Sequence, residues 1–500
     1  MDEHETLISQ NNAQHFEFAN SSDLPAALVD DDDDDAAAAA ELNSLTERSR
    51  RDNSRPNGAT VFQTSLNIAK LCMGTGTLAL PFAAQKGGLV FNMIGLGVIV
   101  VWNYYSADCL LGCLDYIPSR EVVASSSDGC SNKMTRLLMQ SQEYGALEES
   151  YENDYEYSSK TVMNGPPEGT TTYGIVAWHA FGKKGLIVLD LFMIMLFIGL
   201  LISYEAAMIS FMDGINISTG YNRWDKLLPG IVVAVLSCAK DISFLSKFSA
   251  IGLIALALSF GVISAEGIKE NGWVDLNELL TLNLWPESLS AASSWFGVVV
   301  FGYGVVPVIF NVRESMANPQ FFSISTSVGL GTAYVGYLFA SNGVRILFSK
   351  SHSFDGDVLQ ALPNSEIALA VRLMMTFVVT VTAPFIVVPC GEMIEGKLNM
   401  DSNCLSNRIV VRTLLCAMCT LLAVFVPGFV FIISFVGCFC VSVTGFVLPP
   451  LFSIRLKQRA LKHTGCRDVS LLILGVVATV ITSAMTAQDL MDYSTVKATN

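Results

Sequence analysis

Long runs of apolar residues alternate with polar segments along most of this chain of 500 residues. A helix needs about 20 apolar residues to cross the roughly 30 Å hydrocarbon core of a bilayer. Eleven stretches approach or exceed that length, at 61–84, 88–114, 186–212, 228–240, 245–265, 291–311, 323–348, 366–390, 407–427, 428–452 and 469–488. The fourth is short, and the ninth and tenth are nearly continuous across Pro427 and Gly428. The pattern predicts an all-α polytopic membrane protein with about eleven transmembrane helices.

Two of these stretches carry residues that interrupt a helix. The first contains MGTGTLALP at residues 73–81, and the sixth contains GYG at 302–304 followed by Pro307. Glycine and proline cost a helix about 1 and 3 kcal/mol relative to alanine. Interruptions at matching positions of two five-helix halves are typical of transporters with an inverted repeat, whose binding site lies at the breaks. Each motif alone also fits a kink or packing position of an ordinary membrane helix.

An unwound stretch frees backbone N–H and C=O groups, which are tolerated inside a bilayer only where they face a cavity or a ligand. We expect the first break to bind a carboxylate and the second to hold an ammonium group through its carbonyls, with Phe301 or Tyr303 lining a side-chain pocket. The candidate binding residues are Gly74, Thr75, Gly76, Thr77, Phe301, Gly302, Tyr303 and Gly304. Gly95 and Gly97, in the unbroken second stretch, are the comparison positions.

Polar residues inside or beside the apolar stretches are the candidates for ion coupling. They are Asn67, Lys70, Glu205, Lys247, Thr380 and Thr382, with Asp108 and Arg372 as further charged positions. Glu205 could carry a proton or pair with a basic residue, and the Lys247 ammonium could replace a sodium ion or reach toward the interface. The Thr380 and Thr382 hydroxyls, with the Asn67 carbonyl, could form a cation site, or they could bond to carbonyls of their own helix.

Charge divides the chain into regions and orients it. Residues 1–56 carry fourteen acidic and four basic residues, and both this segment and residues 115–172 are polar and of low complexity, so we expect them to be disordered.

The basic residues predict the orientation of the chain in the membrane, because Lys and Arg favour the cytosolic side. With the N-terminus in the cytosol, 21 of the 30 basic residues lie on that side. We expect an acidic cytosolic tail (1–56), a transmembrane domain (57–490) interrupted by the 115–172 loop, and a short non-cytosolic tail (491–500).

Several kinds of chemistry have no candidate residues. None of the five histidines falls at membrane depth, so hydrolysis or acyl transfer within the membrane lacks a base. A P-loop for ATP is also absent. The sequence predicts no enzyme, no cofactor and no metal site. Secondary transport, or a receptor or scaffold, remains.

Several segments resemble those of one known family. The segment 67–83, NIAKLCMGTGTLALPFA, looks like the first-span motif of the amino acid/auxin permease family, and YGIVAWHAFG (173–182) looks like the lead-in to its third span. Residues 241–250 and 307–316 resemble the start of span five and the end of span six. The likeness is nearest to the vacuolar and vesicular amino-acid transporter branch. Gly304-Val305 departs from the family's polar pair, which leaves the substrate open.

The resemblance implies a LeuT-like 5+5 inverted repeat with one further helix, moving amino acids by coupling to a proton or sodium gradient. The alternative is a transceptor, which keeps the fold and senses an amino acid with little flux. An acidic dileucine pattern from Glu3 to Ile8, of the kind read by sorting adaptors, favours a vacuolar or endolysosomal membrane over the plasma membrane.

The distribution of basic residues makes a prediction about topology. Tags at the two ends, mapped by protease accessibility in sealed vesicles, should report a cytosolic N-terminus and a luminal or extracellular C-terminus. Both tags on one side would contradict an odd number of spans.

Overall fold

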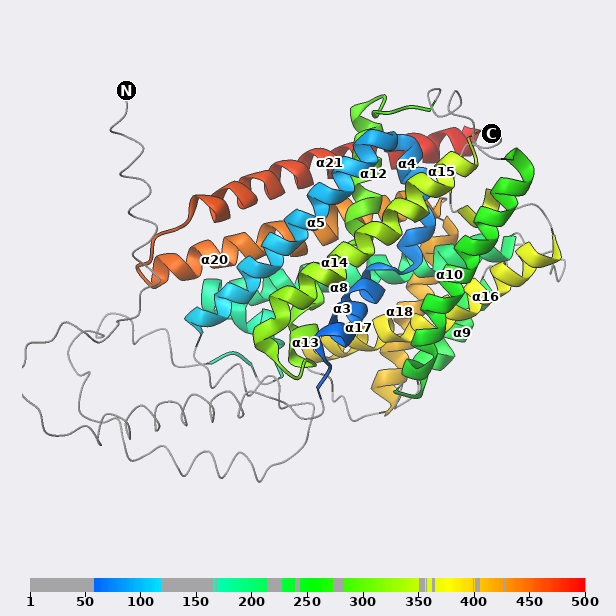
Figure 1. Ribbon diagram of the computed structural model, residues 1–500. Coiled ribbons are helices and arrows are strands. Elements are labelled where there is room, and N and C mark those ends of the chain that lie inside the picture. The colour runs from blue at the N-terminus through cyan, green and yellow to red at the C-terminus, as the bar shows by residue number, and fades with distance from the viewer. Residues whose placement is uncertain are drawn as a thin grey trace, which may run out of the picture. The chain divides into compact units, whose positions relative to one another are not determined.

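The computed structural model (Figure 1) describes residues 58–117, 165–167, 169–213, 227–238, 243–272, 282–349, 356, 358–361, 365–398, 400, 405–425 and 428–499. The described residues form helices, with one isolated parallel β-bridge between Ala59 and Met316. The dileucine pattern, the 1–56 tail and most of the 115–172 loop lie outside the described residues.

The elements before residue 280 are α3 (Val61–Cys72), η1 (Thr75–Ala79), α4 (Leu80–Gly87), α5 (Leu89–Leu111), η2 (Gly112–Tyr116), α8 (Thr172–Asp213), α9 (Leu228–Ser237) and α10 (Ser243–Asn271). Those after it are α12 (Leu289–Gly302), η4 (Val306–Val308), α13 (Ile309–Glu314), η5 (Pro319–Phe321), α14 (Phe322–Leu338), η6 (Phe339–Gly343), α15 (Val344–Leu347), η7 (Val358–Ala361), α16 (Glu366–Thr382), α17 (Pro384–Lys397), α18 (Leu405–Phe425), α19 (Phe429–Val436), η8 (Gly437–Val441), η9 (Val443–Val447), α20 (Leu448–Arg459) and α21 (Cys466–Thr499). The segments η6, η8 and η9 are π-helical, and the other η segments are 3-10 helices.

Seven helical segments of the described chain are long and apolar enough to cross a membrane. They begin at Leu89, Thr172, Leu289, Glu366, Leu405, Phe429 and Cys466. The remaining four apolar stretches correspond to the interrupted α3–η1–α4, the short α9, α10, and α14–η6–α15. The all-α polytopic membrane architecture is confirmed, while the count of eleven and the 5+5 repeat stay predictions.

Helix α8 changes direction where the sequence places the end of its lead-in segment. Gly182 has φ 65° and ψ −152°, a conformation that costs glycine little because it has no Cβ. The segment before this kink is anchored by Tyr173, whose buried hydroxyl donates to the Thr444 carbonyl at 2.7 Å. The lead-in is therefore a separate arm that packs against η9.

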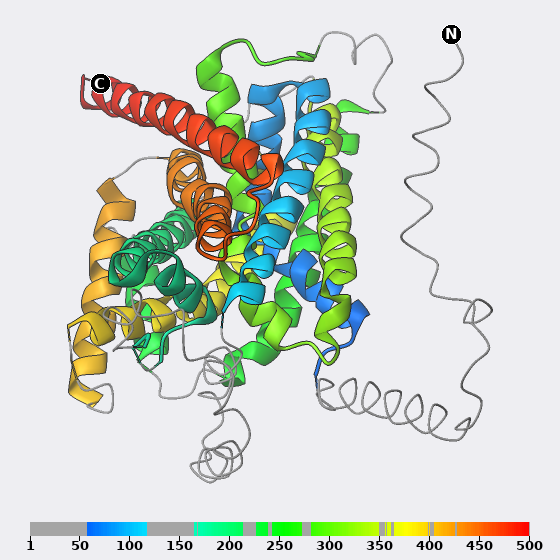
Figure 2. The ribbon, with the colours of Figure 1, turned by 90° about the vertical axis from the view of Figure 1, so that its left-hand side faces the viewer.

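Helix α12 lies in the interior of the bundle. It packs against α4 and α21 (Figures 1 and 2) and against α19 and η8. The most apolar part of the segment Leu289–Glu314, which begins with α12, is 78% buried, against 17% for that of Cys466–Asp492. Small residues let the backbones approach closely: a Cβ atom at Gly437 would lie 1.9 Å from the Gly297 carbonyl oxygen. The Ser434 hydroxyl donates to the Ser294 carbonyl at 3.1 Å across the same crossing.

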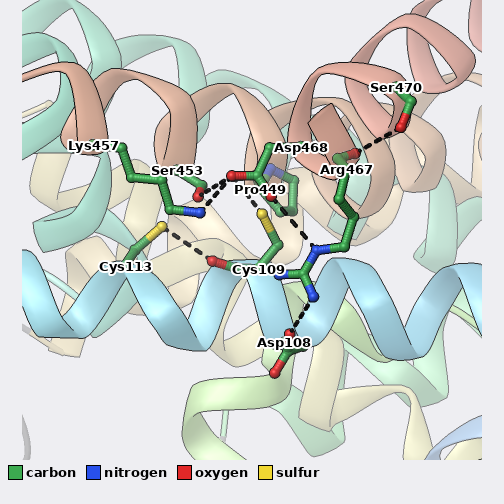
Figure 3. Close-up of polar contacts among 9 residues, drawn as sticks. All are labelled: Asp108, Cys109, Cys113, Pro449, Ser453, Lys457, Arg467, Asp468 and Ser470. Atoms are coloured by element: carbon green, nitrogen blue, oxygen red, sulfur yellow. Dashed lines mark hydrogen bonds and ion pairs between the residues drawn. The ribbon is translucent and has the colours of Figure 1, made fainter. Parts of the chain in front are cut away.

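Two polar clusters join helices that are distant in sequence. At one end of the bundle, buried Asp468 accepts from Lys457 at 2.5 Å and from Ser453 at 3.1 Å, and Arg467 pairs with Asp108 at 3.2 Å (Figure 3). This cluster ties α5, α20 and α21 together. Asp108, a charged position of the second apolar stretch, therefore belongs to a structural ion pair.

The second cluster centres on Asn92 of α5, which is fully buried. Its amide nitrogen donates to Ser341 and to Asn342, both at 2.8 Å, and its oxygen accepts from the Trp295 indole at 2.7 Å. Trp295 belongs to α12, while Ser341 and Asn342 belong to the π-helical η6. One amide thus joins α5 to α12 and η6.

Replacing Asn92 by leucine should lower the thermal unfolding temperature of the purified protein. The change leaves the Trp295 indole without its acceptor, at a cost of about 1–2 kcal/mol, while Ser341 and Asn342 keep their bonds to the Tyr337 and Leu89 carbonyls. Asn103→Leu is the matched control, because buried Asn103 donates only within its own helix, to the Ile99 carbonyl at 2.9 Å. Equal losses for the two variants would contradict a tie between helices.

Candidate functional site

The first apolar stretch is broken at mid-length, as the sequence predicts. Helix α3 ends at Cys72, Gly74 is extended (φ −102°, ψ −156°), and the chain resumes as η1 and then α4. Pro81 lies in the first turn of α4, where an amide hydrogen is not needed. The amides of Thr75 and Gly76, at the start of η1, donate to no described residue.

The sixth apolar stretch is broken at the matching place. Helix α12 ends at Gly302. In the tight turns that follow, the Gly304 amide donates to the Phe301 carbonyl at 3.2 Å and the Val305 amide donates to the Tyr303 carbonyl at 2.7 Å. The chain then continues through η4 and the short α13. The second break therefore also replaces regular helical bonding with local turns.

The two breaks lie against each other. A Cβ atom at Gly76 would fall 2.8 Å from Cδ1 of Phe301 and 3.8 Å from Cα of Gly302. A Cβ at Gly74, in contrast, would meet nothing closer than the Tyr204 hydroxyl at 3.9 Å. The backbone of η1 thus packs on the end of α12, and space remains beside Gly74.

Hydroxyl groups without partners gather around this junction. Thr75 Oγ1, Thr77 Oγ1 and Tyr303 Oη are buried and form no hydrogen bond within the described chain. Thr75 faces Tyr204 and Thr77 faces Tyr337, although neither pair meets hydrogen-bond geometry. Buried polar groups are normally paired, so three unpaired hydroxyls beside two opened helices are what a missing polar ligand would leave.

Tyr337 of α14 completes the junction. Its hydroxyl donates to the Cys72 carbonyl at 2.5 Å, which satisfies an acceptor that the end of α3 leaves free. The rings of Tyr303 and Tyr337 lie 4.7 Å apart at 57°. Sequence reasoning missed Tyr204 and Tyr337, and the only available signal was a phenol within an apolar stretch.

Glu205 follows Tyr204 on α8 but lies near α18 instead of the first break. Its side chain is fully buried, and neither carboxylate oxygen has a hydrogen-bond partner in the described chain. Cys416 and Cys419 of α18 lie near it. The structural ion pair that was the alternative for Glu205 is not formed by any described residue.

The other ion-coupling candidates are not gathered at the breaks. Asn67 is exposed on α3, and Lys70 is half-buried in the last turn of that helix. The Thr380 hydroxyl donates to the Thr376 carbonyl at 2.7 Å, and the Thr382 hydroxyl donates to the Val378 carbonyl at 2.9 Å. Both threonines therefore adopt the back-bonded alternative.

Two further charged candidates belong to other surroundings. Arg372 is buried in α16 and donates to the Leu359 carbonyl at 3.2 Å. Lys247 belongs to α10, and its side chain lies outside the described residues.

The comparison glycines of α5 differ from each other. A Cβ at Gly95 would fall 2.3 Å from the Trp295 ring, whereas a Cβ at Gly97 would meet only Tyr334, at 3.8 Å. A side chain at Gly95 would therefore have to displace the Trp295 ring, whose indole donates to Asn92. A Cβ at Gly97 therefore has about as much room as a Cβ at Gly74.

Comparison with known proteins places the chain among transporters rather than enzymes. The family of transmembrane amino acid transporter proteins matches residues 57–130 and 159–488. Amino acid transporter ANT1 of Arabidopsis thaliana is 23% identical over 444 residues, covering 83% of this chain and 89% of that protein. Amino acid transporter AVT1C of the same plant is 24% identical over 447 residues, covering 84% and 68%.

A more distant relative comes from an animal. Putative sodium-coupled neutral amino acid transporter 10 of Xenopus laevis is 21% identical over 343 residues, covering 63% of this chain and 32% of that protein. Both helix breaks lie within the residues matched by the family, whose span exceeds half of the chain. The chain therefore belongs to the family of transmembrane amino acid transporter proteins, as its resemblance to the amino acid/auxin permeases predicts.

Proposed function

We propose that this protein carries amino acids across a membrane by alternating access and binds them where its two helix breaks meet. The observation that carries this proposal is the junction itself, in which Thr75, Thr77 and Tyr303 present unpaired hydroxyls beside two opened backbones. The relatives' names, which describe amino acid transporters, agree with it.

The chemistry of the junction suits the two charges of an amino acid. The substrate carboxylate would accept from the free amides of Thr75 and Gly76 and from the Thr75 hydroxyl, near the positive end of the η1–α4 segment. The ammonium would donate to carbonyls of the second break, between Phe301 and Gly304. Tyr204 and Tyr337 would border the bound molecule.

Alternating access requires the cytosolic and the non-cytosolic ends of the two broken helices to open in turn. Before α3, the Ala59 amide donates to the Ser315 carbonyl at 2.8 Å, and the Ala317 amide donates to the Ala59 carbonyl at 2.9 Å. These two bonds join the outer limits of α3 and α13, which the topology prediction assigns to the cytosolic side. We infer that release toward the cytosol separates them.

We further propose that Glu205 couples transport to protons. A buried carboxylate without a partner is costly when charged, and Tyr204, one residue away, borders the first break. Sodium coupling is the other possibility, and the name of the Xenopus relative mentions it. The dileucine pattern supports a vacuolar or endolysosomal membrane.

The first test adds a side chain to the open space beside Gly74. Gly74→Val should lower uptake, normalised to inserted protein, by about tenfold or more, because it removes room for a charge-assisted contact of about 1.5–3 kcal/mol. Gly97→Val is the control, since a Cβ there meets its nearest neighbour at 3.8 Å, against 3.9 Å at Gly74.

Equal effects of the two valines would contradict a binding role for the first break. Labelled amino-acid counterflow by the wild-type protein in proteoliposomes separates carrier from sensor. Binding without exchange would favour the transceptor.

The second test removes the titratable group of α8. Glu205→Gln should abolish stimulation of uptake by a pH gradient, while exchange at equal pH persists, because the amide cannot carry a proton. Glu266→Gln serves as the control, since that largely buried carboxylate is paired with Lys269 at 3.3 Å. If Glu205→Gln reduces both activities equally, the residue has a structural role.

A further inference from the structure

A cavity of about 550 Å³ opens at the end of the bundle where α4 ends and α12 begins. Residues from α15, α19 and the end of α21 complete its wall. Because α4 follows the first break and α12 leads into the second, the cavity lies on one half of each broken helix. These are the helix ends that the topology prediction assigns to the non-cytosolic side.

Two basic residues, Lys86 and Arg345, line the cavity together with three acidic ones, Glu287, Asp489 and Asp492. Lys86 lies over the Phe82 ring, 5.5 Å from its centroid, and Arg345 is partly buried in α15. Neither forms an ion pair with a described residue, although both line the same cavity. Each of these two cations can bind an anionic group locally, and an arginine binds a carboxylate through two parallel hydrogen bonds.

The opposite charge is fixed on the C-terminal helix. Asp489 of α21 accepts from the Ser290 hydroxyl at 2.5 Å and from the Ser294 hydroxyl at 3.4 Å, both through Oδ2. The two serines of α12 hold this carboxylate against the cavity, and its Oδ1 accepts from no described residue. The cavity therefore offers an oriented acceptor as well as two donors.

We propose that this cavity is a first binding site for a zwitterionic α-amino acid on its way to the helix breaks. Arg345 and Lys86 bind the carboxylate, and Asp489 binds the ammonium. The site raises the local concentration of substrate on one side of the membrane only. This inference rests on the proposed function and assigns to it a second, sided site.

The test measures the KM for amino-acid exchange from each side of proteoliposomes. The C-terminus lies at the cavity end of α21, so vesicles with an accessible C-terminal tag expose the cavity. Arg345→Gln should raise KM roughly tenfold from the cavity side, the effect of losing a charge-assisted hydrogen bond, and should leave kcat and the KM of the opposite side unchanged. Asp489→Asn should show the same sidedness.

Lys269→Gln is the control, because the exposed Lys269 side chain neutralises only Glu266 and lies outside the cavity. An unchanged KM for both cavity variants, or an equal rise from both sides, would overturn this inference while wild-type exchange still supports the carrier. Absence of exchange by the wild-type protein would overturn the proposed function and this inference together.

Discussion

The structure depends on how backbone polar groups are satisfied where two helices open inside an apolar environment. A free N–H or C=O group in a membrane costs several kcal/mol unless a protein group or a ligand meets it. Tyr337 meets one such group directly, by donating to the Cys72 carbonyl at 2.5 Å. The amides of Thr75 and Gly76 are met by no described residue, and this imbalance is the observation on which we propose a polar ligand between the breaks.

The surrounding helices hold this opened backbone in one place. Helix α12, whose end forms the second break, is fixed by its close crossing with η8 at Gly297 and Gly437 and by the Trp295 bond to Asn92. Asn92 also reaches η6, which follows the helix that carries Tyr337. The same tertiary contacts therefore position both the break and the phenol that caps the first one, so a rigid scaffold surrounds a site that local helix bonding alone would not keep open.

The sequence predicted the helical membrane architecture and both breaks, because apolar length and glycine-proline spacing are local properties. It could not predict which side chains meet at the junction. Tyr204 and Tyr337 come from helices far away in sequence, and their phenols look like ordinary apolar positions until packing brings them to Thr75 and Cys72. Gly95 and Gly97 likewise look equivalent in sequence, yet only Gly95 faces Trp295. The hydroxyls of Thr380 and Thr382 could bind a cation or bond to carbonyls of their own helix, and in the structure they donate to the Thr376 and Val378 carbonyls.

The most direct measurement of the central claim is an experimental structure of the protein in a membrane mimic with an amino acid bound. The account predicts ligand density between η1 and the Phe301–Gly304 turn, with the carboxylate near the Thr75 and Gly76 amides and both helices still open. Regular helical bonding through residues 73–79, with amino-acid density elsewhere in the molecule, would contradict it.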